Sequence, residues 1–353
     1  MLGADIGKQM IQISCCQKSQ NEITEALYQL PKEPEEENII NQIREFLKEQ
    51  QLFLKDGDKM ILSFSEASPD KMKAMKKKLL EAGWQGGEIR FISRENAFVH
   101  YVLHQEMSLY DHTVLLFDFD GTSLFGYRLE HPKKKTPKRF QVEKSAVGSF
   151  DLLGNEKDRG RVFDEHFASV ARQLLSKEVV SAVFLTGKGF EGDWLSKSLN
   201  VICSGRRAFI GQNLFSSGCC YCGMAEEEEK DYMVCAPETV FYESGVVDGA
   251  GDESFVTITK AGRAWYETKG SVDVILERGG KLDVIFSNLL LMEKQVESID
   301  VSALPKRPRK TGRLRVEVQF LGNKKGLITV RDLGFGAFSP ATHQVVMKEF
   351  SLL

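Results

Sequence analysis

One stretch of the sequence, residues 114–122, decides the interpretation of the fold. It reads V-L-L-F-D-F-D-G-T. Its apolar first half predicts a buried strand, and the two acids and the glycine that follow predict a tight turn at a sheet edge. Carboxylates in such a place often serve magnesium or phosphate chemistry. The polar turn of a β-hairpin that binds nothing is the alternative interpretation of this stretch.

Two other stretches have the same character. Residues 3–7 (G-A-D-I-G) precede an expected strand and can bring backbone N–H groups close to a phosphate, with Asp5 left for a metal. Residues 185–192 (L-T-G-K-G-F-E-G) end an apolar strand in glycines, so that the backbone can approach a flat ring or a phosphate. Taken alone, each stretch is equally compatible with an ordinary turn or connection.

The order of the expected elements indicates two domains. Residues 1–225 alternate strand hairpins and helices in two successive sets, which predicts an α/β domain built from two related halves. An acidic run at 226–229 follows, and we expect residues 226–236 to form a linker with no apolar strand that could dock on the first domain. The short, glycine-punctuated segments of residues 237–353 predict an all-β, sandwich-like domain.

Composition excludes several classes of protein. The chain has 353 residues, 42% of them hydrophobic and 27% charged, which favours packed domains over disorder. A formal net charge of −3 does not suggest nucleic-acid binding. No apolar run approaches the roughly 20 residues of a membrane span. The odd number of cysteines, seven, and an N-terminus unlike a secretory signal lead us to expect a cytoplasmic protein.

Taken in order, these stretches resemble the actin/DnaK-type chaperone/sugar-kinase ATPase superfamily, which has an acid–glycine hairpin at the start of each half. The DnaK-type chaperones are the most similar members. Residues 304–320 (L-P-K-R-P-R-K-T-G-R-L-R-V-E-V-Q-F) and 326–332 (G-L-I-T-V-R-D) resemble late strands of the peptide-binding β domain of those chaperones. The resemblance implies an actin-like ATPase domain with reduced peripheral subdomains, followed by a peptide-binding type of β domain.

The resemblance also implies a site for ATP or ADP with magnesium. Asp5 and Asp118 would hold the magnesium. Glu95 and Asp118 would be the catalytic residues, with Glu95 as the one that orders a metal-bound water. The residues that would contact the nucleotide are Asp5, Gly7, Lys8, Gly121, Thr122, Gly187 and Gly189.

Departures from the family pattern weaken this site. Lys8 stands where the family usually has a hydroxyl residue, and Asp120 stands where a glycine would lie beside the phosphates. A carboxylate there repels a phosphate unless a cation intervenes. Residues 31–57 and 146–180 are too few for the peripheral subdomains that supply a catalytic lysine and clamp the adenine. We therefore expect a chaperone-like or scaffolding protein that binds a polypeptide partner, with a vestigial ATP site and at most slow hydrolysis.

Two other functions are compatible with the sequence. D-F-D-G-T after an apolar strand also resembles the first motif of the haloacid-dehalogenase-like phosphatases, with Asp118 as nucleophile, Asp120 as general acid/base and Thr186 in the second motif. Against this, residues 124–130 read as a strand where that family has a loop or helix. The other alternative is an adaptor that binds protein and no nucleotide.

Overall fold

The chain folds into two compact units, Met1–Ala236 and Pro237–Leu353. The computed structural model describes residues 1–16, 23–31, 34–53, 57–66, 68–84, 87–132, 138–149, 159–225, 232–248, 254–276, 280–305, 307, 311–342 and 344–353. The two units are described separately.

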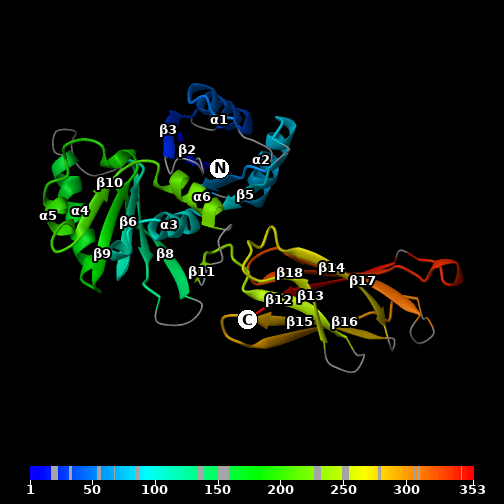
Figure 1. Ribbon diagram of the computed structural model, residues 1–353. Coiled ribbons are helices and arrows are strands. Elements are labelled where there is room, and N and C mark those ends of the chain that lie inside the picture. Colours follow the sequence, from blue (N-terminus) through cyan, green and yellow to red (C-terminus); the bar gives the residue numbers. More distant parts are fainter. Residues whose placement is uncertain are drawn as a thin grey trace. The chain divides into compact units, whose positions relative to one another are not determined.

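The first half of unit 1 is built on a five-stranded mixed sheet with the order β3-β2-β1-β4-β5 (Figure 1). Its strands are β1 (Leu2–Ile6), β2 (Met10–Cys16), β3 (Ile23–Gln29), β4 (Met60–Phe64) and β5 (Ile89–Ile92). The first three strands pair antiparallel, whereas β1, β4 and β5 run parallel. The helices of this half are α1 (Glu36–Glu49), α2 (Pro69–Glu81) and α3 (Arg94–Leu103).

The second half repeats this arrangement. Its sheet has the order β10-β9-β6-β7-β8-β11, so that β8-β7-β6-β9-β10 matches the first sheet strand for strand and direction for direction. The strands are β6 (Thr113–Phe119), β7 (Ser123–Leu129), β8 (Lys138–Ser149), β9 (Val180–Thr186) and β10 (Arg207–Ile210). The helices are η1 (Met107–Leu109), α4 (Arg159–Leu175), η2 (Lys188–Phe190), α5 (Lys197–Ile202) and α6 (Leu214–Ala225). The predicted α/β unit with two related halves, each starting with an acid-bearing hairpin, is confirmed.

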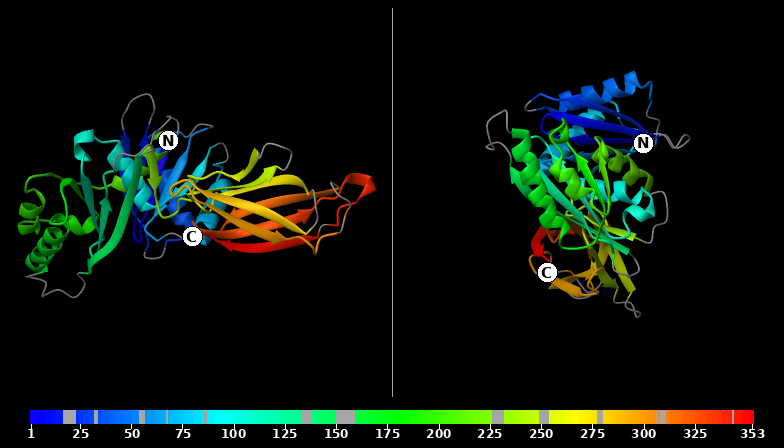
Figure 2. Two further views of the ribbon diagram at one scale, coloured as in Figure 1. Left: turned by 90° about the horizontal axis from the view of Figure 1, so that it is seen from below. Right: turned by 90° about the vertical axis from the view of Figure 1, so that its left-hand side faces the viewer.

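Helices α3 and α6 lie between the two sheets (Figures 1 and 2). They approach each other and β1 closely because glycines stand at the crossings. A Cβ on Gly218 of α6 would lie 2.1 Å from the carbonyl oxygen of Ala97, and one on Gly3 of β1 would lie 2.2 Å from that of Ser216. The start of α3 is fixed as well, since the Ser93 hydroxyl accepts a hydrogen bond from the Asn96 amide (3.0 Å). This packing holds the first residue of α3 between the two halves.

The expected linker is only partly a linker. Residues 226–231, with the acidic run, lie outside the described residues, but Tyr232–Cys235 form a strand, β11, which pairs in parallel with β8. Tyr232 and Val234 pack against the core that α3 and β8 share. The expectation that no apolar strand follows the acidic run and docks on the first domain is therefore wrong. Four mostly apolar residues are enough to form a strand here, because β8 would otherwise be the edge of its sheet and offers unpaired backbone N–H and C=O groups.

Unit 2 is all-β, as predicted. It consists of two four-stranded sheets, with the orders β13-β12-β15-β16 and β14-β17-β18-β19. The strands are β12 (Tyr242–Asp248), β13 (Ser254–Thr259), β14 (Lys269–Leu276), β15 (Lys281–Asn288), β16 (Lys294–Asp300), β17 (Gly312–Phe320), β18 (Lys325–Asp332) and β19 (Val345–Ser351). Alternating side chains such as Phe286, Phe320 and Phe350 meet in one core.

Among the described residues, none of the helices has both the length and the apolar character needed to cross a bilayer.

Candidate functional site

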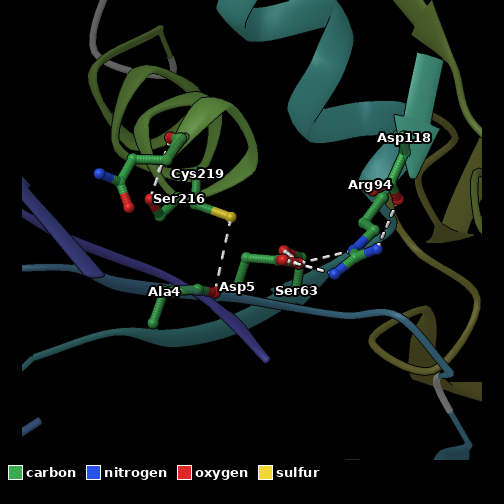
Figure 3. Close-up of polar contacts among 8 residues, drawn as sticks. Ala4, Asp5, Ser63, Arg94, Asp118, Ser216 and Cys219 are labelled. Atoms are coloured by element: carbon green, nitrogen blue, oxygen red, sulfur yellow. Dashed lines mark hydrogen bonds and ion pairs between the residues drawn. The ribbon is translucent and has the colours of Figure 1, made fainter. Parts of the chain in front are cut away.

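The first strands of the two halves each carry one buried acid, and Arg94 joins the two acids (Figure 3). Arg94 is the first residue of α3. Its Nε and Nη2 donate to Oδ1 and Oδ2 of Asp5 at 2.9 and 2.6 Å, and its Nη1 donates to Oδ2 of Asp118 at 2.8 Å. Asp5 is 1% exposed and the Arg94 side chain 13%. The two carboxylates predicted to hold magnesium are thus bridged by a guanidinium.

Neighbouring side chains fix this bridge. The Ser63 hydroxyl donates to Asp5 Oδ1 at 2.7 Å, and the guanidinium carbon of Arg94 lies 4.7 Å from the ring centroid of Phe215. Burial by itself would lower the pKa of Arg94, but Asp5 and Asp118 outweigh burial and raise it above its ordinary value. Arg94 is therefore a permanent cation. Burial raises the pKa of Asp118, although Arg94 opposes this.

Asp120 is bound by its own turn. Its Oδ1 accepts hydrogen bonds from the Thr122 amide, the Thr122 hydroxyl and the Ser123 amide, each at 2.8 Å. Burial favours a higher pKa for Asp120, but the hydrogen bonds from Ser123 and Thr122 prevail and lower it. Two backbone N–H groups at the tip of the second hairpin are thereby used by a carboxylate of the chain itself.

A cavity of about 450 Å³ lies beside the bridge. Its lining contains most of the residues predicted to contact nucleotide or metal: Asp5, Gly7, Lys8, Asp118, Gly121, Thr122 and Gly187. The structure thus brings together three stretches that are far apart in the sequence. Their roles in binding stay predictions.

Two predicted residues are placed differently. Gly189 is not among the residues that line the cavity, and a Cβ there would lie 2.3 Å from a ring carbon of Phe119, so close packing accounts for this glycine. Glu95 does not line the cavity either, whereas its neighbour Arg94 does. An α-helix turns by about 100° per residue, so adjacent side chains at its start point in different directions. The geometry therefore does not support Glu95 as the residue that orders a metal-bound water.

Arg94 is the residue that the sequence analysis missed. The motif S-R-E-N places it directly after a buried strand and a helix cap, between the two acid-bearing hairpins in sequence. A basic side chain at that place could have suggested an internal partner for the acids.

Two protein-family models match the sequence, and the description of neither one states a function. The model described as "Family of unknown function (DUF5716) C-terminal" matches residues 37–236, more than half of the chain. The chain belongs to this family. A second model, "Domain of unknown function (DUF8552)", matches residues 246–352 of this DUF5716 family member. No curated protein matches the sequence.

Solved structures similar to this family member have low sequence identity. The activator of the 2-hydroxyisocaproyl-CoA dehydratase from Clostridium difficile, with bound ADPNP, is 11% identical, with 64% of this chain and 94% of that chain covered and a TM-score of 0.41. The ethanolamine utilization protein EutJ from Carboxydothermus hydrogenoformans is 11% identical, with 62% and 88% covered and a TM-score of 0.43. An Aquifex aeolicus member of the Ppx/GppA family is 11% identical, with 65% and 98% covered and a TM-score of 0.36.

Proposed function

We propose that this protein binds a polypeptide partner and that its ATPase-like site does not turn over ATP at an enzymatic rate. One observation carries the second half of the proposal: Arg94 holds both carboxylates that would hold magnesium. The superfamily resemblance implies magnesium at this place, but the residues present do not fit it.

The misfit follows from charge and coordination. Magnesium requires near-octahedral oxygen ligands at about 2.0–2.1 Å, usually including carboxylates. Both oxygens of Asp5 and one of Asp118 already accept hydrogen bonds from the Arg94 guanidinium. A divalent cation would have to displace a buried arginine from two buried acids and then lie next to its positive charge. Such a displacement is unfavourable, because a buried charge without a partner costs several kcal/mol.

The second hairpin disfavours nucleotide binding for a similar reason, because its turn already has an anionic partner within the chain. The Thr122 and Ser123 amides, which an anion would need at this turn, already donate to Asp120. A phosphate would have to replace a carboxylate that is attached to the turn itself. The chain therefore provides both a cation for the two acids and an anion for the turn.

The partner-binding half of the proposal is supported by unit 2. β16 and β19 are outer strands of the two sheets, and side chains connect them: Lys348 donates to the Ser298 carbonyl at 2.9 Å, and Gln295 donates to the Ser351 carbonyl at 3.2 Å. We therefore expect a peptide to bind through exposed apolar side chains of this region and not through a free backbone edge. These two strands also expose apolar side chains, Val296 at 53% and Met347 at 64%. The resemblance of residues 304–320 to strands of a peptide-binding domain points in the same direction.

Two measurements on the full chain test the proposal. We expect ATP turnover with magnesium near the uncatalysed background, and a fluorescent apolar peptide should bind with an affinity that ATP does not change. Steady-state turnover of roughly 1 per second or faster would contradict the first half. If extended peptides fail to bind but a folded protein does, the adaptor function replaces the chaperone-like one; if no polypeptide binds, the second half is wrong.

The phosphatase alternative is less well supported by the geometry. Its nucleophile, Asp118, is bound to Arg94, and its acid/base, Asp120, is bound to its own turn. After Asp118 the chain continues as an antiparallel hairpin, with Asp118 opposite Phe125. We expect no hydrolysis of p-nitrophenyl phosphate; hydrolysis that Asp118→Asn abolishes would restore this alternative.

A further inference from the structure

Strand β10 forms an open edge of the second sheet of unit 1. It pairs in parallel with β9 on one side, and it stands last in the order of the strands, so its other side has no strand partner among the described residues. Phe209 and Ile210 of this strand are 39% and 61% exposed. Such an edge can pair with another extended segment through its backbone N–H and C=O groups.

The corresponding strand of the first half is covered. Strand β5 has the same place at the edge of the first sheet, and its apolar residues Ile89, Phe91 and Ile92 are all buried. Three of the four residues of β10 are exposed. The topology that the two halves share therefore does not require an exposed strand at this place, and the exposure belongs to the second half alone.

The backbone of β10 has free groups on its open side. The amide of Gly211, directly after the strand, donates to the carbonyl oxygen of Leu185 in β9 at 3.0 Å. Backbone groups of successive strand residues point to opposite sides, so the N–H and C=O groups of Ala208 and Ile210 face the open edge. These groups have no backbone partner within the ranges that the structure describes.

A groove with a cationic lining adjoins β10. Its volume is about 610 Å³, and residues of α4 and α5 line it, including the apolar Leu175 and Val201. Ala208 of β10 packs in the same apolar cluster as these two residues, so the groove and the strand edge are neighbours. Its described lining contains no carboxylate. The cations of the lining are Arg172, Lys197 and Arg206.

The groove cations are only partly neutralised. Lys197 lies 2.6 Å from Glu165, which is not part of the lining. Arg206 donates to two carbonyl groups at the end of α5, at 3.1 and 3.4 Å. Arg172 has no carboxylate partner in the part of the chain that the structure describes. Guanidinium N–H groups are therefore left for an acid from outside the chain.

Helix dipoles account for part of this positive charge. Arg172 lies in the last turn of α4 and Arg206 at the end of α5, where the dipole favours a cation. Lys197 is the first residue of α5, where the dipole disfavours one. Each helix end amounts to roughly half an elementary charge, so the two helix ends and Glu165 balance about two of the three cations. The groove retains a positive surplus.

We propose that an extended polypeptide segment adds to β10 as a further strand, with apolar residues beside Phe209 and Ile210 and acidic residues in the groove. Strand addition gives affinity through backbone hydrogen bonds, and side chains give specificity. A second copy of this chain fits less well, because in an antiparallel pairing of two β10 strands the residues after Ile210 (G-Q-N-L) would meet the groove, and none is acidic. The proposal goes beyond the proposed function, since it adds a partner surface in unit 1.

Fluorescence anisotropy with the full chain tests the proposal. The probe is a labelled peptide of alternating valine and threonine residues with glutamates on both sides, and the control probe has lysines in place of the glutamates. We expect the acidic probe to bind at least about tenfold more tightly than the lysine probe. Added salt should weaken its binding, because salt screens exposed charges. Failure of the acidic probe to bind, or equal affinity for the two probes, would overturn the proposal.

Two variants of Ile210 distinguish strand addition from a simple apolar contact. Ile210→Pro removes the N–H group on the open side and keeps the hydrogen bond between Gly211 and Leu185. It should weaken binding of the acidic probe about tenfold, which is about 1.4 kcal/mol. Ile210→Val retains the N–H group and should leave the affinity within about twofold. Melting temperatures verify that both variants fold, and unchanged affinity in folded Ile210→Pro would contradict strand addition.

Arg172→Ala tests the groove. It should weaken binding of the acidic probe about fivefold, which is about 1 kcal/mol. Lys77→Ala, on α2 and 78% exposed, is the control and should bind as wild type does. Unchanged affinity in Arg172→Ala would overturn the proposal, and so would a dimer, seen by light scattering, that Ile210→Pro abolishes. ATP turnover and binding of an uncharged apolar peptide are separate readouts, so failure here is distinguishable from failure of the proposed function.

Discussion

The two acid-bearing hairpins of unit 1 have the same strand topology, yet their acids are satisfied in different ways. In the first hairpin, Asp5 uses both carboxylate oxygens for Arg94 and receives a further hydrogen bond from Ser63. In the second hairpin, Asp118 uses one oxygen for Arg94, and Asp120 closes the turn by itself. The first hairpin thus anchors the arginine, whereas the second holds it less firmly and blocks its own turn. The two halves thus share one strand topology but contribute different contacts to the Asp5–Arg94–Asp118 bridge.

Removing Arg94 should have the largest effect, because it breaks the contact between the hairpins. Arg94→Ala leaves two buried acids without their cation, and we expect the free energy of unfolding to fall by about 3–5 kcal/mol. Magnesium should then recover part of the loss, since the freed carboxylates can bind it. Urea denaturation with and without magnesium measures both effects. Arg161→Ala, which removes an exposed pair with Glu165, is the control and should change stability by less than about 0.5 kcal/mol.

The acids themselves should differ in the order that their contacts predict. Asp5→Asn removes charge from an acid with two contacts to Arg94 and should cost about 2–4 kcal/mol, whereas Asp118→Asn should cost less than about 1 kcal/mol, because burial already disfavours the charge of Asp118. Urea denaturation of the two variants at neutral pH measures the difference. An equal or larger cost for Asp118→Asn would contradict the view that the first hairpin is the anchor.

The two acids of the second hairpin should have opposite effects on stability at low pH. Because the pKa of Asp120 is lowered in the folded state, its stabilising contribution is present above its unfolded pKa of about 3.9 and is lost as pH falls below it. Because the pKa of Asp118 is raised, its ionised form opposes folding, and this penalty disappears as pH falls through the raised pKa. Unfolding between pH 3 and 6 should therefore show a shallower acid loss for Asp120→Asn than for wild type. A steeper acid loss in Asp120→Asn would show that the assigned directions are wrong.

The smallest effect is expected at the tip of the first hairpin. Lys8 and Glu66 form an exposed pair, with side chains 63% and 65% exposed, so Lys8→Ala should alter stability by at most about 0.5 kcal/mol. Thermal unfolding at low and high salt measures this. A loss above about 1 kcal/mol would mean that the tip of the first hairpin, like that of the second, is held by its own polar contacts.

The sequence predicted the parts of the fold that depend on local pattern. Apolar strands followed by acid–glycine turns identified both hairpins, and the change after residue 225 identified the all-β unit. Arg94 escaped prediction because it lies 89 residues from Asp5 and 24 from Asp118, and no local rule states which side chain a buried acid will meet. Glu95 was chosen through a family resemblance that places an acid at the start of this helix. The role of Gly189 stays a prediction, because a glycine needed for close packing against Phe119 has the same sequence signature as one that contacts a ligand.

Strand β11 determines where the chain can be cut. A fragment that ends at residue 225 follows the boundary that composition suggests, but it lacks Tyr232–Cys235 and leaves the β8 edge without its partner. Bare edges of this kind promote association between copies. A fragment that ends at Ala236 retains this strand, and one that begins at Pro237 carries none of it. To express the two units separately, the chain should therefore be cut between Ala236 and Pro237. This cut lies eleven positions after the boundary at residue 225 that the acidic run indicates.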